Sequence, residues 1–278
     1  MTPPRRVAVV GHVEHVSLAR VPALPAPGDI VHIDQPITFP GGGGGVAYAQ
    51  LARSAAEAHL FTAFGTGDAG DEAAREIGRA GRVHAARRDV PHPRSVVLVT
   101  PDGERTILVV GAPLHPHASD ALPWELLAGC DCAYFTGEDP DTLRAARAAR
   151  VLVVTARRRA ALVRSGVRAD VVVGSARDPR EASALADYPV PPGALVLTEG
   201  AQGGRIETAA GVVRFAAPPS PPVLGAAYGA GDTFAAALTW YVAAGSSVRD
   251  ACARAGVHGA AVLAGLDPRS SQLPLPPT

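Results

Sequence analysis

Four consecutive residues, Gly229-Ala230-Gly231-Asp232, have the types and the spacing for phosphoryl-transfer chemistry. They precede an apolar helical pattern that starts at Phe234, so they read as a glycine turn that opens a helix. Such a turn points several backbone N–H groups into one space, and the positive end of the helix dipole adds to them. The turn therefore predicts an anion site. A carboxylate such as Asp232 is a poor ligand for an anion, but it suits a base that takes a proton from an attacking hydroxyl.

Each glycine cluster has a plainer interpretation beside the functional one. Asp232 could simply cap the helix, because Asp is a favoured N-cap residue. The run Gly41–Gly45 also precedes a helical pattern and offers bare backbone to a ligand, but it could be a flexible loop. Thr198, Gly200 and Gly203 follow a predicted strand, where open α/β sheets bind ligands, but they could form an ordinary hairpin turn.

The basic residues restrict how the chain can handle phosphate. The sequence contains no lysine, and all 26 basic residues are arginine. This excludes the P-loop lysine, the protein-kinase strand lysine and Schiff-base mechanisms. Any nucleotide phosphates must therefore be bound by backbone N–H groups, arginine and metal.

Composition excludes several other classes of protein. The formal net charge of the 278 residues is zero, which argues against nucleic acid or an anionic membrane as a partner. We expect no membrane span, because no apolar run reaches the length of about 18 residues that a span requires. The amino terminus lacks the apolar core of a signal peptide. The three cysteines have no metal-binding spacing, which favours a reducing cytoplasm.

The order of elements predicts an α/β fold. Short β-branched runs alternate with Ala-, Leu- and Arg-rich helical patterns, which is typical of a mainly parallel sheet covered on both faces in a three-layer sandwich. The predicted strands are Arg6–Gly11, His59–Phe64, Cys132–Thr136, Val151–Thr155, Val171–Gly174 and Leu195–Thr198. The predicted helices are Val46–Ala55, Asp71–Gly81, Asp141–Ala149, Ala160–Gly166 and Arg180–Leu185.

Two regions interrupt this alternation. Asp29–Phe39 alternates as a strand does, and Ser95–Val110 reads as a hairpin with a turn at Pro101-Asp102-Gly103. We expect these strands, within about 12–40 and 94–111, to form a small β-sheet lid on a single domain that spans 1–278. A second hairpin, with strands Gly204–Thr208 and Val212–Ala216, precedes the Asp232 turn.

Taken in order, these pieces resemble one family, the ribokinase-like or PfkB-type carbohydrate kinases. The resemblance covers nearly the whole chain. It rests on a first strand ending in Gly11, Pro25-x-Pro27-Gly28, the Gly41-Gly42 helix start, Phe64-Gly65 through Gly70-Asp71, Asp102 through Thr106, Thr198-x-Gly200-x-x-Gly203 and Gly229-Ala230-Gly231-Asp232.

The resemblance implies a role for each motif. Asp232 would be the base, and the backbone of Gly229, Ala230 and Gly231 would stabilise the moving phosphoryl group. Thr198, Gly200 and Gly203 would lie along the phosphates and ribose of ATP, and Gly41 and Gly42 would face the substrate. Mg²⁺ would be held mostly by phosphates and waters.

Several residues depart from the family pattern. Sugar kinases of the family usually have Asp at the position of Val16 and Asn at that of Val46, so two sugar-gripping groups are missing. Glu14 is the expected replacement. Ala226 stands where Asp is frequent, so the resemblance does not support the family's monovalent-cation site. Asp178 aligns best with the end of an Asn-x-x-Glu motif and would order metal-bound water.

Three further residues have two interpretations each, and a fourth has one. Glu138 could reach substrate hydroxyls or could be an exposed acid at a helix start. Arg105 could contact the substrate from the lid or could be a solvated strand end. His258 lies in a helical stretch that in the family runs beside the adenine, so it either packs there or contacts the nucleotide. His115, in a proline-containing loop, is expected to be solvated.

The sequence thus predicts ATP-dependent phosphorylation of a hydroxyl group on a small sugar-like or nucleoside-like molecule, with a homodimer through the lid. Alternatives are a nucleoside kinase and a non-catalytic binding protein of the same fold. A Rossmann oxidoreductase is disfavoured, because no Gly-x-Gly-x-x-Gly follows the first strand.

Overall fold

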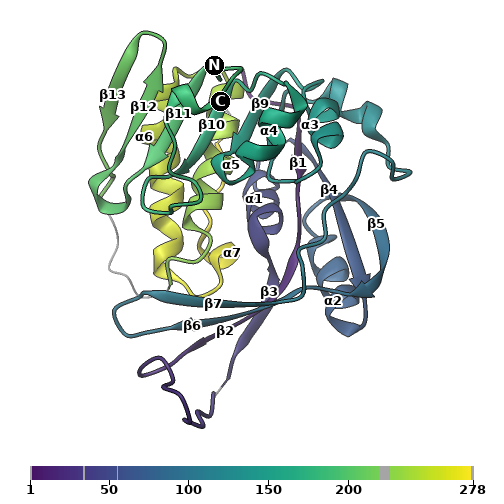
Figure 1. Ribbon diagram of the computed structural model, residues 1–278, viewed down its shortest axis with the longest axis vertical. Coiled ribbons are helices and arrows are strands. Elements are labelled where there is room, and N and C mark those ends of the chain that lie inside the picture. The colour runs from purple at the N-terminus through teal and green to yellow at the C-terminus, as the bar shows by residue number, and fades with distance from the viewer. Residues whose placement is uncertain (1, 34, 55, 220–225, 277–278) are drawn as a thin grey trace.

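The computed structural model of the chain describes residues 2–33, 35–54, 56–219 and 226–276, and within them a nine-stranded central sheet dominates the fold (Figure 1). The strands run in the order β13-β12-β11-β10-β9-β8-β1-β4-β5. Seven neighbouring strands from β11 to β5 are parallel, and the hairpin β12–β13 continues the sheet in antiparallel fashion. Their bounds are β1 Arg6–Val10, β4 Glu57–Thr66, β5 Arg82–Pro91, β8 Cys132–Phe135, β9 Val151–Thr155, β10 Val171–Ser175, β11 Ala194–Thr198, β12 Gly204–Thr208 and β13 Gly211–Phe215.

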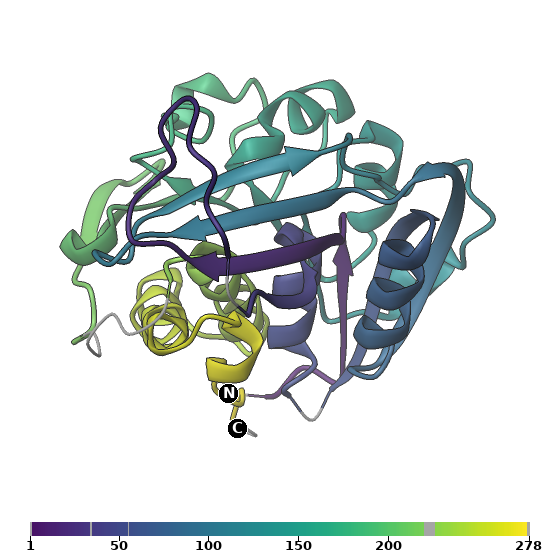
Figure 2. The same ribbon diagram turned by 90° about the horizontal axis from the view of Figure 1, so that it is seen from below.

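Helices cover both faces of this sheet and bury a core on each side (Figure 2). One core contains residues of α1, α2, α5 and α6, and the other contains residues of α3 and α4. Both are rich in valine, leucine and alanine, as expected for parallel strands buried on both faces. The helices are α1 Gly42–Leu51, α2 Asp68–Ile77, α3 Pro140–Ala146, α4 Arg159–Ser165, α5 Ala230–Ala243, α6 Val248–Ala261 and α7 Pro268–Ser271, with short 3₁₀ turns at Trp124–Gly129, Ala156–Arg158, Leu185–Asp187, Gly200–Gln202 and Val262–Ala264. The predicted three-layer α/β fold is therefore confirmed.

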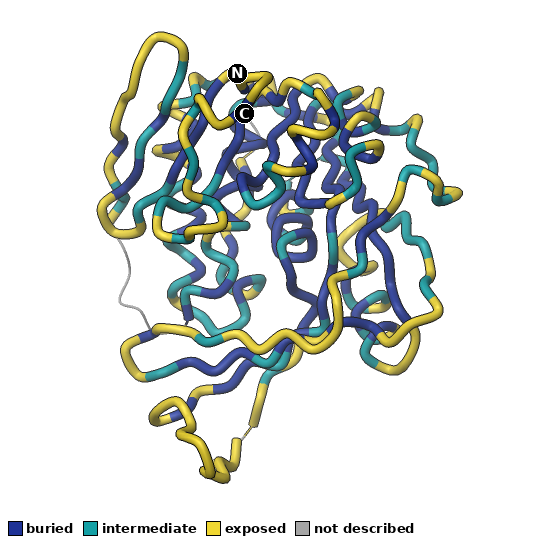
Figure 3. The backbone as a smooth tube through the Cα atoms, in the orientation of Figure 1, coloured by how far each residue is buried: buried dark blue, intermediate teal, exposed yellow. Residues whose placement is uncertain are grey.

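A second, four-stranded sheet lies across one end of the molecule, opposite the end where both termini lie (Figures 1 and 2). Its order is β3-β2-β6-β7, with β2 Glu14–Arg20, β3 Ile37–Gly41, β6 Arg94–Val99 and β7 Arg105–Val110. The inner side of this sheet packs a third apolar cluster, which includes Val16, Phe39 and Tyr228. The strand β7 and the segment between β2 and β3 are largely exposed (Figure 3). The predicted small β-sheet is thus present.

Three element predictions were wrong in detail. The segment Arg180–Leu185 is not a helix, because the carboxylates of Asp178 and Glu181 bind backbone N–H groups of Arg180 and Ser175 and hold a turn instead. The expected strand Asp29–Phe39 is a strand only from Ile37. Strand β5 was not predicted, because its arginines and histidines obscure the alternation of apolar and polar residues.

Helix starts also differ from the prediction. Helix α1 begins at Gly42 rather than Val46, and α2 begins at Asp68 rather than Asp71. The predicted end of the first helix, Ala55, lies outside the described residues. None of the helices in the described part of the chain is both long and apolar enough for a membrane span.

Candidate functional site

The central sheet has its topological switch point between β1 and β8. From β1 the chain builds outward through β4 and β5, whereas β8 leads outward in the other direction through β9, β10 and β11. Ligands of open α/β sheets bind in the crevice where the strand order reverses, beyond the carboxyl ends of the strands. His12 follows β1 at this edge, and Thr136 follows β8.

The amino terminus of α5 lies at the same edge and is open. Gly229 is its N-cap with φ of +78°, and no side chain caps the helix. A Cβ added to Gly231 would meet no atom of the described residues within 4 Å, so the first turn is not packed against that part of the chain. The exposed backbone N–H groups there can receive an anion. This is the arrangement that the Gly229–Asp232 motif predicted.

Asp232 lies between this helix end and the glycine start of α1. A Cβ on Gly43 would lie 3.2 Å from Asp232 Oδ1 and 3.0 Å from Thr136 Oγ1. Burial, helped by the charge of Glu181, raises the pKa of Asp232 to about 6, although His12, Arg157 and Arg105 oppose the shift. A carboxylate with a pKa close to neutrality accepts a proton more readily than an ordinary Asp.

The α1 glycines are placed differently from the prediction. Gly41 and Gly42 are buried, and the N–H of Gly42 donates to the Tyr228 hydroxyl at 2.9 Å. The N–H of Gly44 donates to the His12 carbonyl. Gly43 is the residue of this run that remains partly exposed and faces Asp232. A substrate would therefore meet Gly43 rather than Gly41 or Gly42.

Polar side chains line the side of the crevice next to the small sheet. Glu14 Oε2 accepts a 2.5 Å hydrogen bond from Ser95, and Glu14 Oε1 lies 3.3 Å from His12 Nε2. Burial raises the pKa of Glu14, but the bonds and charges from His12, Ser95 and His92 outweigh it and lower the pKa. Glu14 is therefore an ionised, almost fully buried carboxylate beside Gly42, whose added Cβ would lie 3.3 Å from Glu14 Cγ.

His115 corrects a sequence prediction. It is 5% exposed rather than solvated, and its ring packs edge-on to His12 at 5.0 Å. Arg158 Nη2 lies 3.1 Å from His115 Nε2, and Arg158 Nε donates to the Thr136 carbonyl. Burial, together with the charges of His12 and Arg158, lowers the pKa of His115 to about 2, so the ring is neutral.

Glu138 and Arg105 both lie at the mouth of this region. Glu138 Oε2 is 3.6 Å from His115 Nε2 and 3.7 Å from Arg158 Nη1. Asp139, not Glu138, caps α3. The positive charge of Arg105, at the start of β7, is felt by both Asp232 and Tyr228. Both side chains are accessible: that of Glu138 is 62% exposed, and Arg105 is exposed.

The three residues expected to contact the nucleotide differ in burial: Thr198 and Gly200 are accessible, whereas Gly203 is buried. Gly200 is exposed, with φ of +64°, and Thr198 is partly exposed at the end of β11. An added Cβ on Gly200 would lie 2.7 Å from Arg177 Nη1. Gly203 is buried, and its positive φ and close contact with the Phe215 carbonyl serve the β12–β13 hairpin. Direct contact of Gly203 with a ligand is therefore not supported.

His258 is also corrected by its burial. It is 3% exposed, with Nε2 3.1 Å from the Tyr241 hydroxyl. Burial lowers the pKa of its imidazole. This residue packs α6 against α5, and it leaves no open edge for an adenine ring.

Asp178, which was expected to order metal-bound water, forms an ion pair with Arg157. Arg157 Nη2 lies 2.5 Å from Asp178 Oδ2 and 2.8 Å from Glu181 Oε1, and Arg180 also contacts Asp178. Glu181 is the acid whose charge reaches Asp232. Within the ranges that the structure describes, no three His, Cys, Asp or Glu side chains gather as a metal site requires. Glu181 and Arg157 were missed because no local motif marks them.

Val16, Val46 and Ala226 do not line the crevice. They are each at most 1% exposed and share the apolar cluster with Phe39 and Tyr228. The Val46 carbonyl accepts from Gln272 Nε2, which also donates to Thr233 Oγ1 next to Asp232. Val16 and Val46, at the positions where sugar kinases of the family usually have Asp and Asn, are thus core residues.

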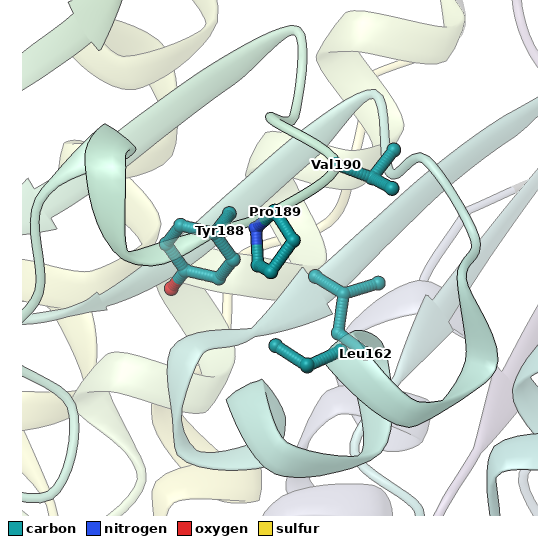
Figure 4. A pocket seen from close by; sticks show the side chains of 5 residues that line it. Leu162, Tyr188, Pro189 and Val190 are labelled. Atoms are coloured by element: carbon teal, nitrogen blue, oxygen red, sulfur yellow. The ribbon is translucent and has the colours of Figure 1, made fainter.

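Two hollows lie on the surface of the described residues, and the larger of them borders this region. One of 580 Å³ is lined by residues that include Arg88, His115, Glu138 and Arg164. The other lies between Leu162 of α4 and Tyr188, Pro189 and Val190 (Figure 4). Its volume of 10 Å³ holds no more than about one water molecule, so it carries no function here.

The fold is thus an α/β sandwich in which the glycine start of α5 lies at the switch point of the central sheet. The family model of the pfkB family carbohydrate kinases matches residues 4–274. The chain belongs to this family. No protein of curated function matches the sequence significantly.

Solved structures share the fold over nearly the whole chain. An adenosine kinase from Sinorhizobium meliloti is 19% identical with a TM-score of 0.77, and each chain is covered to 96%. A ribokinase from Thermotoga maritima is 16% identical with a TM-score of 0.75, covering 97% of this chain and 96% of that one. An Arabidopsis thaliana ribokinase complexed with ribose and ATP is 18% identical with a TM-score of 0.74, covering 98% and 96%. The family and these neighbours support a sugar or nucleoside kinase.

Proposed function

We propose that this protein is a kinase that transfers a phosphoryl group from ATP to a hydroxyl group of a small sugar-like or nucleoside-like molecule. Asp232 is the general base, and the backbone of Gly229, Ala230 and Gly231 stabilises the transferred group. One observation carries the proposal. Asp232, whose burial raises its pKa to about 6, lies at the open end of α5 and faces Gly43 across the crevice.

The nucleotide would lie along the carboxyl ends of β10 and β11. Of the three residues expected to contact the nucleotide, Thr198 and Gly200 are accessible there. Phosphates placed between them and α5 would point their terminal group at Gly231. Mg²⁺ would be held mainly by these phosphates and by water. Bound to the phosphates, the ion neutralises negative charge in the transfer step.

The acceptor would lie among Gly43, Glu14, Glu138 and Arg105. Glu14 would bind hydroxyl groups, because its carboxylate is ionised and partly satisfied by Ser95 and His12. Since Val16 and Val46 are buried in the core, the site lacks the Asp and Asn side chains that bind sugar hydroxyls in sugar kinases of the family. Weak or no activity on D-ribose and D-fructose is expected.

The test is a panel of sugars, nucleosides and polyols, scored by ADP release from purified protein with Mg·ATP. ADP release that requires one class of acceptor and disappears in Asp232→Asn supports the proposal. ADP release that no acceptor stimulates in any class contradicts it and favours a non-catalytic binding protein. On the identified acceptor, Glu14→Ala should raise KM strongly.

A nucleoside kinase is the second candidate. The observation that favours it is the apolar filling at Val16 and Val46, which leaves the polar contacts of an ordinary sugar site incomplete. The similarity to the fold of an adenosine kinase is compatible with this choice. Preference for adenosine or another nucleoside over free sugars in the same panel distinguishes the two.

The small sheet is proposed to act as a lid and to pair two copies. Its edge strand β7 exposes four successive apolar residues, between 41% and 53% exposed, from Ile107 to Val110. An open apolar edge strand is prone to pair with another chain. Analytical ultracentrifugation should show a dimer that Leu108→Glu dissociates, and a monomeric wild type contradicts this part.

A further inference from the structure

Three arginines follow β9 in direct succession and point to three different surroundings. Arg157 contacts Asp178 and Glu181, Arg158 contacts His115 and Thr136, and Arg159 contacts Asp187 at the surface. A chain without lysine must neutralise phosphate with arginine, metal or backbone. The question is which of its arginines is placed for that task.

Arg157 has both the position and a free donor. It follows β9 at the carboxyl edge of the sheet, next to β10, and α5 packs over both strands. Its Nε and Nη2 are held by Glu181 at 2.9 Å and by Asp178 at 2.5 Å. Within the described ranges Nη1 has no hydrogen bond, and the side chain is 33% exposed. The guanidinium group is thus fixed through Nε and Nη2, whereas Nη1 has no partner among the described residues.

The two carboxylates keep this guanidinium in place. Glu181 is itself anchored, because Oε2 accepts from the backbone N–H of Ser175 at 2.9 Å. Asp178 is held by the backbone N–H and the side chain of Arg180. The charges of Asp178 and Glu181 outweigh burial and raise the pKa of Arg157, so it stays protonated. Its charge is also one of those that lower the pKa of Asp232, a residue in the first turn of α5.

We propose that Arg157 is the cation of the phosphoryl-transfer site, and that its Nη1 binds the terminal phosphate of ATP. Glu181 and Asp178 orient it, as carboxylates orient a preformed guanidinium fork. This inference rests on the proposed function. It adds a residue that binds the transferred phosphate and supplies the positive charge that a lysine supplies in other kinases.

The test measures binding of ATP, ADP and AMP by calorimetry in the presence of Mg²⁺, so it needs no acceptor. Arg157→Gln should weaken ATP binding about 10- to 100-fold, the range for loss of one charge-assisted hydrogen bond, while ADP and AMP change less than about threefold. Arg159→Gln is the matched control from the same run and should change none of the three. Arg157→Lys should recover part of the ATP affinity.

A second variant distinguishes a direct contact between Arg157 and the phosphate from simple neutralisation of Asp178 and Glu181. Arg157→Gln leaves two unpaired carboxylates, which could repel phosphate by themselves. The double variant Arg157→Gln with Asp178→Asn restores the net charge of the three-residue group but not the guanidinium. ATP affinity should remain low in it. Thermal melting of each variant shows whether it is folded.

Three results would overturn the inference: recovery of ATP affinity in the double variant, equal losses for ATP and ADP, or no loss at all. Each of these leaves the kinase proposal intact, because wild-type protein still binds ATP. Failure of the wild type to bind ATP would instead remove the proposed function itself.

Discussion

Helices α1 and α5 both begin at glycines and lie side by side, yet glycine serves different purposes at the two starts. At α5, an added Cβ on Gly231 would touch no described residue within 4 Å, and no side chain in the described ranges caps the helix. At α1, an added Cβ on Gly44 would lie 2.5 Å from the His12 carbonyl oxygen. The start of α5 is therefore accessible to a ligand, whereas the start of α1 is packed against other residues of the protein.

The difference shows what a glycine cluster can and cannot indicate. At α1 the N–H groups of Gly42 and Gly44 are already used by Tyr228 and His12, so little remains for an anion. The closeness of α1 to the β1 edge brings Gly43 against Asp232 instead. We therefore expect α5 to bind the transferred phosphate and α1 to shape the acceptor site.

The largest expected effect is at Asp232. Asp232→Asn removes the base while keeping nearly the same shape, and it should lower kcat on the identified acceptor on the order of 10²–10⁴-fold. ATP binding should be nearly unchanged, which calorimetry can check. Wild-type turnover in this variant would mean that the open start of α5 does not perform the chemistry.

Next in size is the effect of filling the open helix start. Gly231→Val places a side chain where the transferred group would lie, and it should lower kcat on the order of 10²–10³-fold. The melting temperature should change little, because an added Cβ meets no protein atom. A large loss of stability with unaltered kcat would show that α5 is closed as α1 is.

The closed start gives the opposite expectation. Gly44→Ala forces a Cβ against the backbone of His12 and Gly11, at 2.5 and 2.9 Å, so the protein must shift. Overpacking of this kind costs about 1–3 kcal/mol of unfolding free energy, measurable by urea denaturation. If Gly44→Ala is as stable as the wild type, the start of α1 has more room than the packing indicates.

The pH dependence sharpens the assignment of Asp232. Its pKa is about 6 in the folded state against an ordinary 3.8, so the folded protein binds more protons than the unfolded chain between these values. Stability therefore falls as pH rises from about 4 to 6, by roughly 2–3 kcal/mol in total. Asp232→Asn should recover that amount at pH 8 and little at pH 4.

The same pKa predicts the activity profile. Asp232 must be ionised to act as a base, so kcat/KM should rise through a midpoint near pH 6 and then level off. Stability and activity thus change in opposite directions over one pH range. A rate that is independent of pH between 5 and 8 would contradict the assignment.

Much of the fold followed from the sequence because its signals are local. Apolar strands without alternation and the helices between them predicted the central sheet, and the Pro101-Asp102-Gly103 turn predicted the β6–β7 hairpin. The element missed outright, β5, carries arginine and histidine on a sheet edge, where tertiary pairing rather than composition makes a strand. The false helix at Arg180–Leu185 failed because side-chain bonds from Asp178 and Glu181 competed with helical ones.

The sequence by itself predicted a type of chemistry. Gly229 to Asp232 needed no tertiary information, because a glycine turn, a helix start and an acid are adjacent in the chain. The tertiary structure alone decided which distant groups surround that acid: Glu181 and Arg157 on one side, His12 and Gly43 on the other. It also decided that Val16, Val46 and His258 belong to the core. The physical reason is that burial and charge depend on all the segments packed around a residue, whereas a motif records only its neighbours in sequence.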